Sequence, residues 1–295
     1  MKIVEPLVEL WQQTNAKAHI VRCARICYGR ESGNDDATYN RLLNDKHNSM
    51  FRHESVYAAI PYDKIRHIFH SVVSSYMKCP YIKWATVNDI VYFSTNGNFL
   101  LDVEKENPTL YYWIHDNRIS EDELIKVPYC FQHLVRYTFC VVTQISTSRE
   151  LNRVSPNNIA EQSTRYVYEN GTICRPHWLE GYDINQVLNE GSHINTDGNV
   201  ESVLEYKAKL YIESCSRSFN DYKKLVDAGL HRQDARGVLP IDTATKCAYT
   251  YTIDEWRAII NLRYYGTTGK PHPNAKIIAG MIREKLIQLG HSFRD

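Results

Sequence analysis

The segment Phe131–Thr147 constrains the fold most strongly, because it holds the clearest β-strand pattern in the sequence. Valine, threonine, phenylalanine and tyrosine dominate it, and these residues favour strands. A shorter strand is predicted at Ser55–Ile60. Apolar residues recur with a helical period in residues 16–28, 62–78, Val200–Leu230, Asp254–Tyr264 and Ala275–Leu289. We therefore expect an α+β fold, a single mixed domain in which long helices pack against a β-sheet.

Two stretches interrupt this pattern. Residues 80–125 mix strand-like pieces with Asn-Gly-Asn and Asn-Pro breakers, which predicts an irregular insertion. Residues 170–200 are rich in Gly, Asn, Asp and His, which is typical of a flexible surface excursion. We expect one domain over residues 1–295, with insertions at about 62–130 and 170–200.

Charge and hydropathy exclude several classes of protein. Lys and Arg total 35 against 34 Asp and Glu, so the net charge is +1 and no global field attracts nucleic acid or an anionic membrane. No run approaches the roughly 18 apolar residues that span a bilayer, and residues 1–10 do not resemble a signal peptide. We expect a cytoplasmic protein that binds a small molecule through a local cluster of side chains, and no nucleic acid or membrane.

The eight cysteines lie far apart, which is not typical of a disulfide framework in a chain of this length. Cys23 and Cys27 lie one helical turn apart and could belong to a zinc site, but two further ligands at comparable spacing are missing. Buried free thiols are the favoured interpretation. His47 and His53 are likewise better explained as ordinary polar histidines, and we expect no metal site.

The window Arg149–Tyr166 carries three arginines, several hydroxyl groups and a loop around Pro156. A phosphate group needs such fixed donors, because guanidinium groups bind it through two parallel hydrogen bonds. By themselves these residues also fit a solvated turn with scattered charges. Glycine-rich phosphate loops, dinucleotide-binding fingerprints and the common hydrolase motifs are not found in the sequence.

This window resembles the flavin-dependent thymidylate synthases. Their signature is Arg-His-Arg, seven residues and Ser, within a pattern that ends Glu-x-Ser-x-Arg-Tyr. Arg153 takes the first arginine, seven residues separate Ser155 from Ser163, and Glu161–Tyr166 matches in full. Similar blocks occur in family order at Ala24-Arg25, at His47–His53, at Ala235–Pro240, at Asn261–Arg263 and at His272 with Ala275.

The resemblance implies reductive methylation of dUMP at C5 to give dTMP. Methylenetetrahydrofolate would supply the one-carbon unit, and FAD reduced by NADPH would supply the hydride. It also implies a homotetramer with flavin sites between subunits. A mechanism without a protein nucleophile agrees with the cysteines, since only Cys79 lies next to a cation and it lies away from the matched blocks.

Carried over position by position, the resemblance assigns roles to individual residues. Arg263 would be the catalytic residue, lying by the uracil edge and stabilising negative charge on its carbonyl. The residues that would bind dUMP are Arg153, Glu161, Ser163, Thr164, Arg165, Arg236 and Arg263. The residues that would bind FAD are His47, Ser49, Arg153 and His272.

Several positions depart from the family pattern. Val154 and Ser155 replace the His and second Arg of the signature. Arg52 stands where an acidic residue is common, Glu150 where Gln is usual, and Thr252, Asp254 and Ala258 where Asn, Arg and Asn are frequent. A second hypothesis is therefore a pyrimidine-nucleotide-binding homologue with an altered substrate or lost flavin chemistry. A third, an unrelated α+β protein, requires the ordered matches to be accidental.

Overall fold

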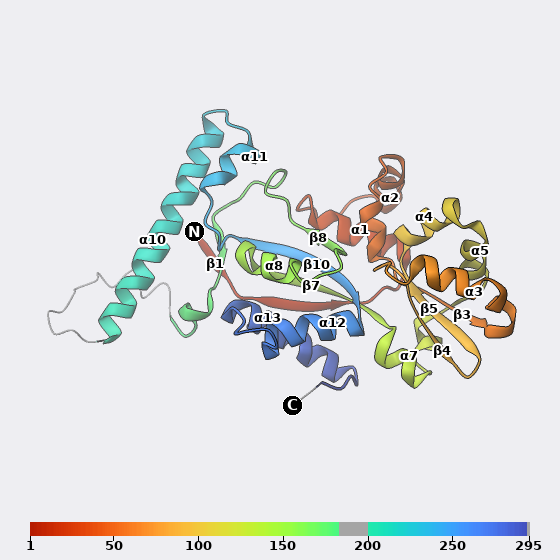
Figure 1. Cartoon of the computed structure of the whole chain (residues 1–295). Helices are drawn as coiled ribbons and strands as arrows, with labels where there is room; N and C mark the ends of the chain where they lie inside the picture. Colours follow the sequence, from red (N-terminus) through yellow and green to blue (C-terminus); the bar gives the residue numbers. More distant parts are fainter. Residues whose placement is uncertain (183–199, 294–295) are drawn as a thin grey trace.

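A four-stranded antiparallel sheet with the strand order β2-β7-β10-β8 forms the centre of the molecule (Figure 1). The computed structural model describes residues 1–182 and 200–293. The strands of the central sheet are β2 (Leu7–Trp11), β7 (Arg136–Gln144), β8 (Ile159–Glu161) and β10 (Ala244–Thr252). β7 and β10 pair along their whole length, and the predicted mixed α+β class is confirmed.

The strand predicted within Phe131–Thr147 is confirmed as β7, but its predicted ends are wrong. α7 (Pro128–His133) precedes it and α8 (Ile145–Asn152) follows it. Proline in the first turn favours the start of α7. The first backbone N–H groups of α8 donate to the carbonyls of Thr243 and Ile241 at 3.0 and 3.1 Å, so the chain after β7 can turn directly into a helix.

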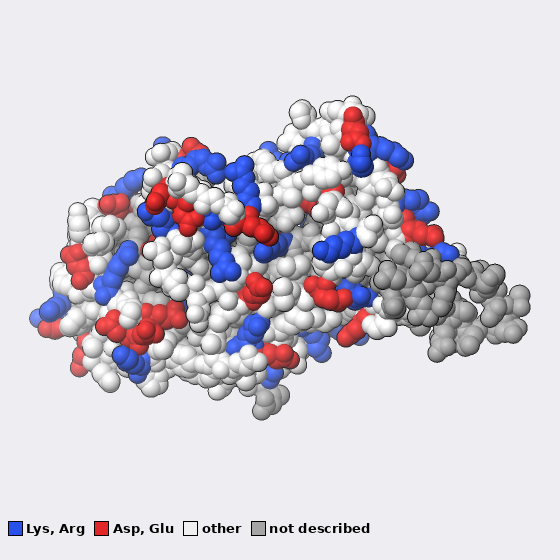
Figure 2. Space-filling model, turned by 180° about the vertical axis from the view of Figure 1, so that it is seen from behind, with Lys and Arg blue, Asp and Glu red and all other residues white. Residues whose placement is uncertain are grey.

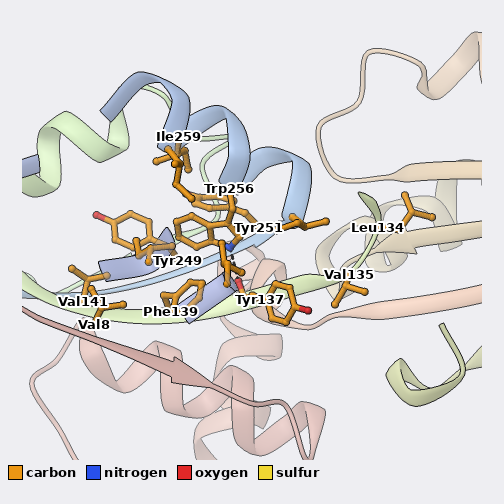
Figure 3. Close-up of a cluster of buried hydrophobic side chains, with 14 of the residues drawn as sticks. Val8, Leu134, Val135, Tyr137, Phe139, Val141, Tyr249, Tyr251, Trp256 and Ile259 are labelled. Carbon is orange, nitrogen blue, oxygen red and sulfur yellow. Dashed lines mark hydrogen bonds between the residues drawn. The ribbon is translucent and has the colours of Figure 1, made fainter. Parts of the chain in front are cut away.

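Helices cover both faces of the central sheet. The side chains of β10 alternate: Tyr249 and Tyr251 face α12 (Ile253–Ile260) and α13 (Pro273–Gln288), whereas Ala248 faces α1 (Ala16–Ile26). Figure 3 shows Trp256 of α12 packed over these tyrosines, with its Nε1 donating to the carbonyl of Tyr137 at 3.1 Å. These three predicted helices are confirmed.

One predicted helix changes type before its end. The helix predicted over Asp254–Tyr264 is an α-helix only to Ile260, and η4 (Asn261–Tyr265) continues it as a π-helix. The predicted buried thiol is confirmed for Cys23, which lies on the buried face of α1, and burial raises its pKa. Cys27 is only partly buried.

A second antiparallel sheet, with the order β4-β5-β3-β6, lies beside the central one. We call residues 56–124 the side lobe (Figure 1). η1 (Asn48–His53) leads into it, and its elements are β3 (Val56–Pro61), α3 (Tyr62–Tyr76), β4 (Lys83–Val87), β5 (Ile90–Thr95), α4 (Gly97–Glu106), α5 (Pro108–Asp116), β6 (Arg118–Ile119) and α6 (Glu121–Leu124). The predictions of a strand at Ser55–Ile60 and a helix over 62–78 are confirmed.

The prediction that residues 80–125 are irregular is wrong. Asn96 and Asn107, which read as breakers, start α4 and α5, because their side-chain oxygens accept backbone N–H bonds at 2.9 and 3.1 Å. The side lobe has its own apolar core, and Tyr57 and Tyr92 join it to the core of the central sheet. One domain over residues 1–295 stays a prediction.

The remaining elements lie at the end of the central sheet opposite the side lobe (Figure 1). They are β1 (Lys2–Val4), β9 (Thr172–Cys174), η2 (His177–Leu179), α10 (Val200–Asp227), α11 (Arg232–Ala235) and η3 (Arg236–Val238); α2 (Asp35–Asn44) packs on α1. The helix predicted over Val200–Leu230 is confirmed as α10. Most of the excursion predicted at 170–200 lies outside the described residues. Among the described helices, none is long and apolar enough to cross a bilayer.

Candidate functional site

The loop after β8, which carries the matched residues Ser163–Tyr166, packs on the end of α1. The N–H of Ser163 donates to the carbonyl of Cys27 at 3.2 Å. Gly29 has φ +60°, and a Cβ there would lie 2.9 Å from Val167, so this turn requires glycine. The close approach allows the ring of Tyr28 to stack on Tyr166 at 5.4 Å.

An open cavity of about 550 Å³ lies against this loop. It is lined by Tyr28, Arg30, Arg165, Tyr166, His231, Arg232 and Gln233, and we call it the arginine pocket. Its lining holds three guanidinium groups and no carboxylate. Figure 2 shows positive and negative side chains interspersed over one face of the protein, in keeping with the net charge of +1. The excess of positive charge in the pocket is therefore local.

Backbone and side-chain contacts fix the arginines around this pocket. Arg232 donates from Nη1 to the carbonyl of Tyr166 at 2.9 Å, and Arg165 lies 5.4 Å over the ring of the same tyrosine. The N–H of Arg165 donates to Oγ of Ser163 at 3.3 Å, and Arg236 donates to Oγ1 of Thr164 at 3.1 Å. The structure thus brings Ser163, Thr164, Arg165 and Arg236 together.

No ion pair occupies Arg165, Arg232 or Arg236 within the described ranges. Unpaired guanidinium groups at a cavity can bind an anionic ligand through paired N–H donors. The arrangement can therefore hold a phosphate group.

Glu161, at the end of β8, lies in a polar cluster. Its Oε1 accepts from Oγ of Ser148 at 2.7 Å and from Oγ1 of Thr245 at 3.3 Å, and its Oε2 accepts from Nδ2 of Asn152 at 3.3 Å. These bonds tie β8 to α8 and β10. The carboxylate therefore fixes the start of the matched loop relative to α8.

Arg153 and Arg263 meet at Glu150 on α8. Nε of Arg263 donates to the carbonyl of Glu150 at 2.8 Å, and its Nη2 lies 3.4 Å from Oε2. Arg153 reaches Oε1 of the same carboxylate at 3.1 Å, but its side chain is 72% exposed against 15% for Arg263. The glutamate that replaces the usual glutamine therefore neutralises part of the charge of both arginines.

His47 and Ser49 lie exposed at η1, above a buried polar junction. Nη2 of Arg136 donates to the carbonyl of Arg52 at 3.0 Å, and Arg136 is 4% exposed. Nε of Arg52 and Nε of Arg136 are buried and have no hydrogen-bond partner among the described residues. Two arginines meet at this junction, and guanidinium groups are suited to the phosphate part of a dinucleotide cofactor.

His53 is buried at the same junction, beside Arg52 and Arg136. Its Nδ1 lies 2.8 Å from Oγ1 of Thr250, and burial lowers its pKa to about 3. The imidazole is therefore neutral at physiological pH, and any positive charge here comes from the two arginines.

His272 precedes α13 and caps it, with its Nδ1 accepting from the N–H of Asn274 at 3.3 Å. Its ring packs edge-on against His177 at 5.9 Å. The contacts of His272 are thus to η2 and its own helix, whereas His47 and Ser49 lie on η1. Within the described part of the chain, the contacts of these three residues do not bring them together.

Three arginines at these sites are not among the residues predicted from the sequence. Arg232 lies four residues before Arg236, a spacing that puts both on one helical face, and Arg30 directly follows the turn at Gly29. Arg136 begins the strand with the strongest apolar pattern. Arginine is rarely buried in such a strand unless it is paired. The sequence carries a signal for each of these arginines, but the residues that each one contacts are seen only in the folded structure.

The sequence profile of the family described as thymidylate synthase complementing protein matches residues 128–288. A flavin-dependent thymidylate synthase of Kosmotoga olearia is 28% identical over 133 residues, which is 45% of this chain and 55% of that protein. The match thus spans about half the length of this curated relative.

Two crystal structures of the UMP/dUMP methylase PolB from Streptomyces cacaoi align with the fold at 16% identity. The one bound with 5-Br dUMP has a TM-score of 0.45, covering 98% of this chain and 93% of that chain. The one bound with 5-Br UMP has a TM-score of 0.46, covering 98% and 92%. Because the matched profile covers more than half of the sequence, this chain belongs to the thymidylate synthase complementing protein family.

Proposed function

We propose that this protein is an enzyme that methylates dUMP at C5 to give dTMP. Methylenetetrahydrofolate is the one-carbon donor, FAD carries the hydride and NADPH is the reductant. Membership of the family supports the class of reaction. The observation that carries the proposal is the arginine pocket, where residues of the fully matched block line a cavity with three guanidinium groups and no carboxylate.

The phosphate of the nucleotide binds in this pocket. Arg165 and Arg232 offer paired N–H donors, and Ser163, Thr164 and Arg236 lie beside them. The stacked Tyr28 and Tyr166 provide an aromatic surface beside the phosphate. Because Arg165, Arg232 and Arg236 have no carboxylate partner among the residues described, their charge is available to the ligand.

Arg263 acts at the uracil. Its guanidinium stabilises negative charge that develops on the pyrimidine carbonyl during methyl transfer, an electrostatic role that needs no proton transfer. The backbone carbonyl of Glu150 orients it, and the Glu150 carboxylate reduces its net charge. Glu161 keeps α8, and with it Glu150, in place relative to the phosphate-binding loop.

The residues around η1 fit FAD. Arg52 and Arg136 would hold its phosphates, His47 and Ser49 lie exposed beside them, and Arg153 and His272 are the further contacts that the family pattern assigns. When bound, FAD supplies the hydride. The protein residues bind and orient the ligands and neutralise their negative charge. The residues assigned to the nucleotide and those assigned to the flavin lie on different elements. This agrees with a homotetramer whose sites form between subunits. Light scattering tests this, and a monomer would contradict it.

The test is an assay of the purified protein with dUMP, methylenetetrahydrofolate, FAD and NADPH. We expect dTMP by chromatography only when all four are present, and a flavin absorbance band after gel filtration with FAD. No dTMP and no retained flavin, with dUMP still bound, favours the second candidate, a nucleotide-binding homologue. Asp254 in place of the usual arginine is the observation that favours that candidate. UMP in place of dUMP tests an altered substrate.

A further inference from the structure

Glu169 is a buried carboxyl that the proposed nucleotide site does not use. It lies near the end of residues 162–171, the loop between β8 and β9, which we call the β8–β9 loop (Figure 1). The first half of this loop brings Arg165 and Tyr166 to the arginine pocket. Glu169 is 6% exposed, and glutamate is almost never buried this deeply unless it is paired. Within the described ranges, however, Glu169 forms no ion pair.

Aromatic contacts hold the end of the β8–β9 loop against α10 and α11. The ring of Tyr168 packs on Tyr222 of α10, with the ring centroids 5.4 Å apart, and Arg232 of α11 lies 5.7 Å over the ring of Tyr168. Phe219 of α10 lies against the glycine that ends the loop. Glu169 lies beside the buried Tyr222, so its carboxyl is enclosed where the loop packs on α10.

Arg232 also joins this end of the loop to the arginine pocket. Its Nη1 donates to the carbonyl of Tyr166 at 2.9 Å, and it lines the pocket itself. The N–H of Val167 donates to the carbonyl of Ser163 at 2.9 Å, which closes the turn that carries Arg165. Release of the loop from α10 would therefore move Arg165 away from Arg232.

The groups around Glu169 suit a neutral carboxyl better than a charged one. The side chain of Gln162 faces it, and the two tyrosines beside it are phenols, which are neutral near pH 7. Arg232 and Lys223 face these tyrosines, and neither pairs with Glu169. From β1, the backbone N–H of Lys2 donates to the carbonyl of the last loop residue at 2.8 Å. A protonated carboxyl costs far less to bury in such surroundings than a carboxylate.

Burial raises the pKa of Glu169 from the ordinary value of 4.5 to about 7. Between these two values the docked loop binds more protons than a released loop, in which the carboxyl is exposed to water. Docking therefore weakens as the pH rises from 4.5 to 7, and the loss levels off above pH 7.

We propose that Glu169 is a positioning residue of the nucleotide site. In its protonated form it holds the β8–β9 loop on α10, in the arrangement that presents Arg165 and Arg232 to an anionic ligand. Loss of the proton releases the loop and weakens binding of the nucleotide, whose identity rests on the proposed function. Glu169 thus acts through the loop and does not contact the ligand itself.

Hydrogen exchange followed by mass spectrometry tests the release of the loop in the purified full chain without a ligand. Exchange of residues 163–170 is compared between the parent protein and Glu169→Gln at the same pH, so the pH dependence of the chemical exchange rate cancels. We expect the parent-to-variant ratio of exchange rates to rise about tenfold from pH 6 to pH 8.5, because only the parent loop loses bound protons on this path. Glu180→Gln removes an exposed carboxylate and is the matched control, which should show no such rise.

The central sheet is the reference that separates local release from global unfolding. In the parent protein at pH 8.5, residues 163–170 should exchange faster than β7, because the loop detaches while the sheet stays folded. Circular dichroism checks that each variant folds. A parent-to-variant ratio that does not change with pH overturns the proposal, and so does a loop that exchanges at the same rate as β7.

Calorimetric titration with dUMP at pH 6 and pH 8.5 tests the effect on the site. The Kd of the parent protein divided by that of Glu169→Gln should rise about threefold or more between these pH values, because a released loop no longer presents Arg165 and an ionised Glu169 reduces the local positive charge. The dUMP phosphate and His231, which lines the pocket, are the same in both titrations, so their own response to pH cancels.

The two measurements separate this inference from the proposed function. If the loop is released at pH 8.5 but the ratio of Kd values stays constant, the positioning role is contradicted while dUMP binding stands. If dUMP binds to neither protein at either pH, the proposed function is contradicted, and the exchange measurement then decides this inference by itself.

Discussion

Glu150 contacts two of the arginines assigned to the nucleotide, so its charge should control how strongly they attract an anion. We expect Glu150→Gln to lower the Kd for dUMP about two- to fivefold, because Arg263 and Arg153 lose a neutralising carboxylate. The bond from Arg263 to the backbone carbonyl of residue 150 persists, so the orientation is kept. Calorimetry at low salt measures the change. Glu104→Gln on α4 of the side lobe controls for net charge, and an equal effect there would refute the local explanation.

Arg165 has the clearest expected role at the scale of one side chain. Arg165→Ala should weaken dUMP binding by about 1.5–3 kcal/mol, the magnitude of a charge-assisted hydrogen bond. Arg165→Lys should give an intermediate loss, because it keeps the charge and loses the planar fork. Arg217→Ala, exposed on α10, is the control. An unchanged dissociation constant in Arg165→Ala would remove this residue from the site.

At the scale of elements, Trp256 anchors α12 to the central sheet. It is 1% exposed, packs edge-on against Tyr251 at 4.9 Å and Phe139 at 5.1 Å, and donates to the carbonyl of Tyr137. We expect Trp256→Ala to lower the free energy of unfolding by about 3–5 kcal/mol, as large aromatic-to-alanine changes in cores do. Trp256→Phe should cost less, because it keeps most of the buried ring. Urea unfolding measures both, and similar losses would assign the stability to the hydrogen bond instead of the packing.

The elements that sequence reasoning predicts best are those whose signal is local. β7 follows from its content of strand-favouring residues, and α1 and α13 follow from apolar periodicity. The side lobe does not, because the same asparagines that cap helices also occur in loops, and its strands gain an apolar face only when they pair.

The features of the site also differ in whether a local sequence pattern predicts them. The matched block around Arg165 lies at a cavity, as an arginine-rich phosphate site requires. The bonds of Glu150, the unpaired Nε of Arg136 and the cavity that Asp254 lines between the side lobe and α12 depend on contacts between residues distant in sequence, which no local pattern encodes.

At the scale of the whole molecule, buried titratable groups give stability two opposing dependences on pH. Burial lowers the pKa of His19 to about 4 and of His53 to about 3. Between these values and the ordinary histidine pKa near 6.5, the unfolded chain binds more protons, so this contribution to stability rises with pH. Burial raises the pKa of Glu169 to about 7, so between the ordinary value of 4.5 and 7 the folded chain binds more protons and stability falls as pH rises.

Replacing Glu169 separates these two contributions. Glu169 is 6% exposed and lies beside Tyr222 of α10, so above pH 7 the folded protein must bury an ionised carboxylate. Glu169→Gln removes this cost, which is at most about 3 kcal/mol at pH 8 and small near pH 5, where the folded state keeps the carboxyl protonated. We therefore expect the variant to unfold at a higher temperature than the parent protein at pH 8, and the gain to shrink towards pH 5. Thermal unfolding at both pH values measures it. An equal gain at both would mean that glutamine improves packing and that the carboxyl of Glu169 does not titrate in this range.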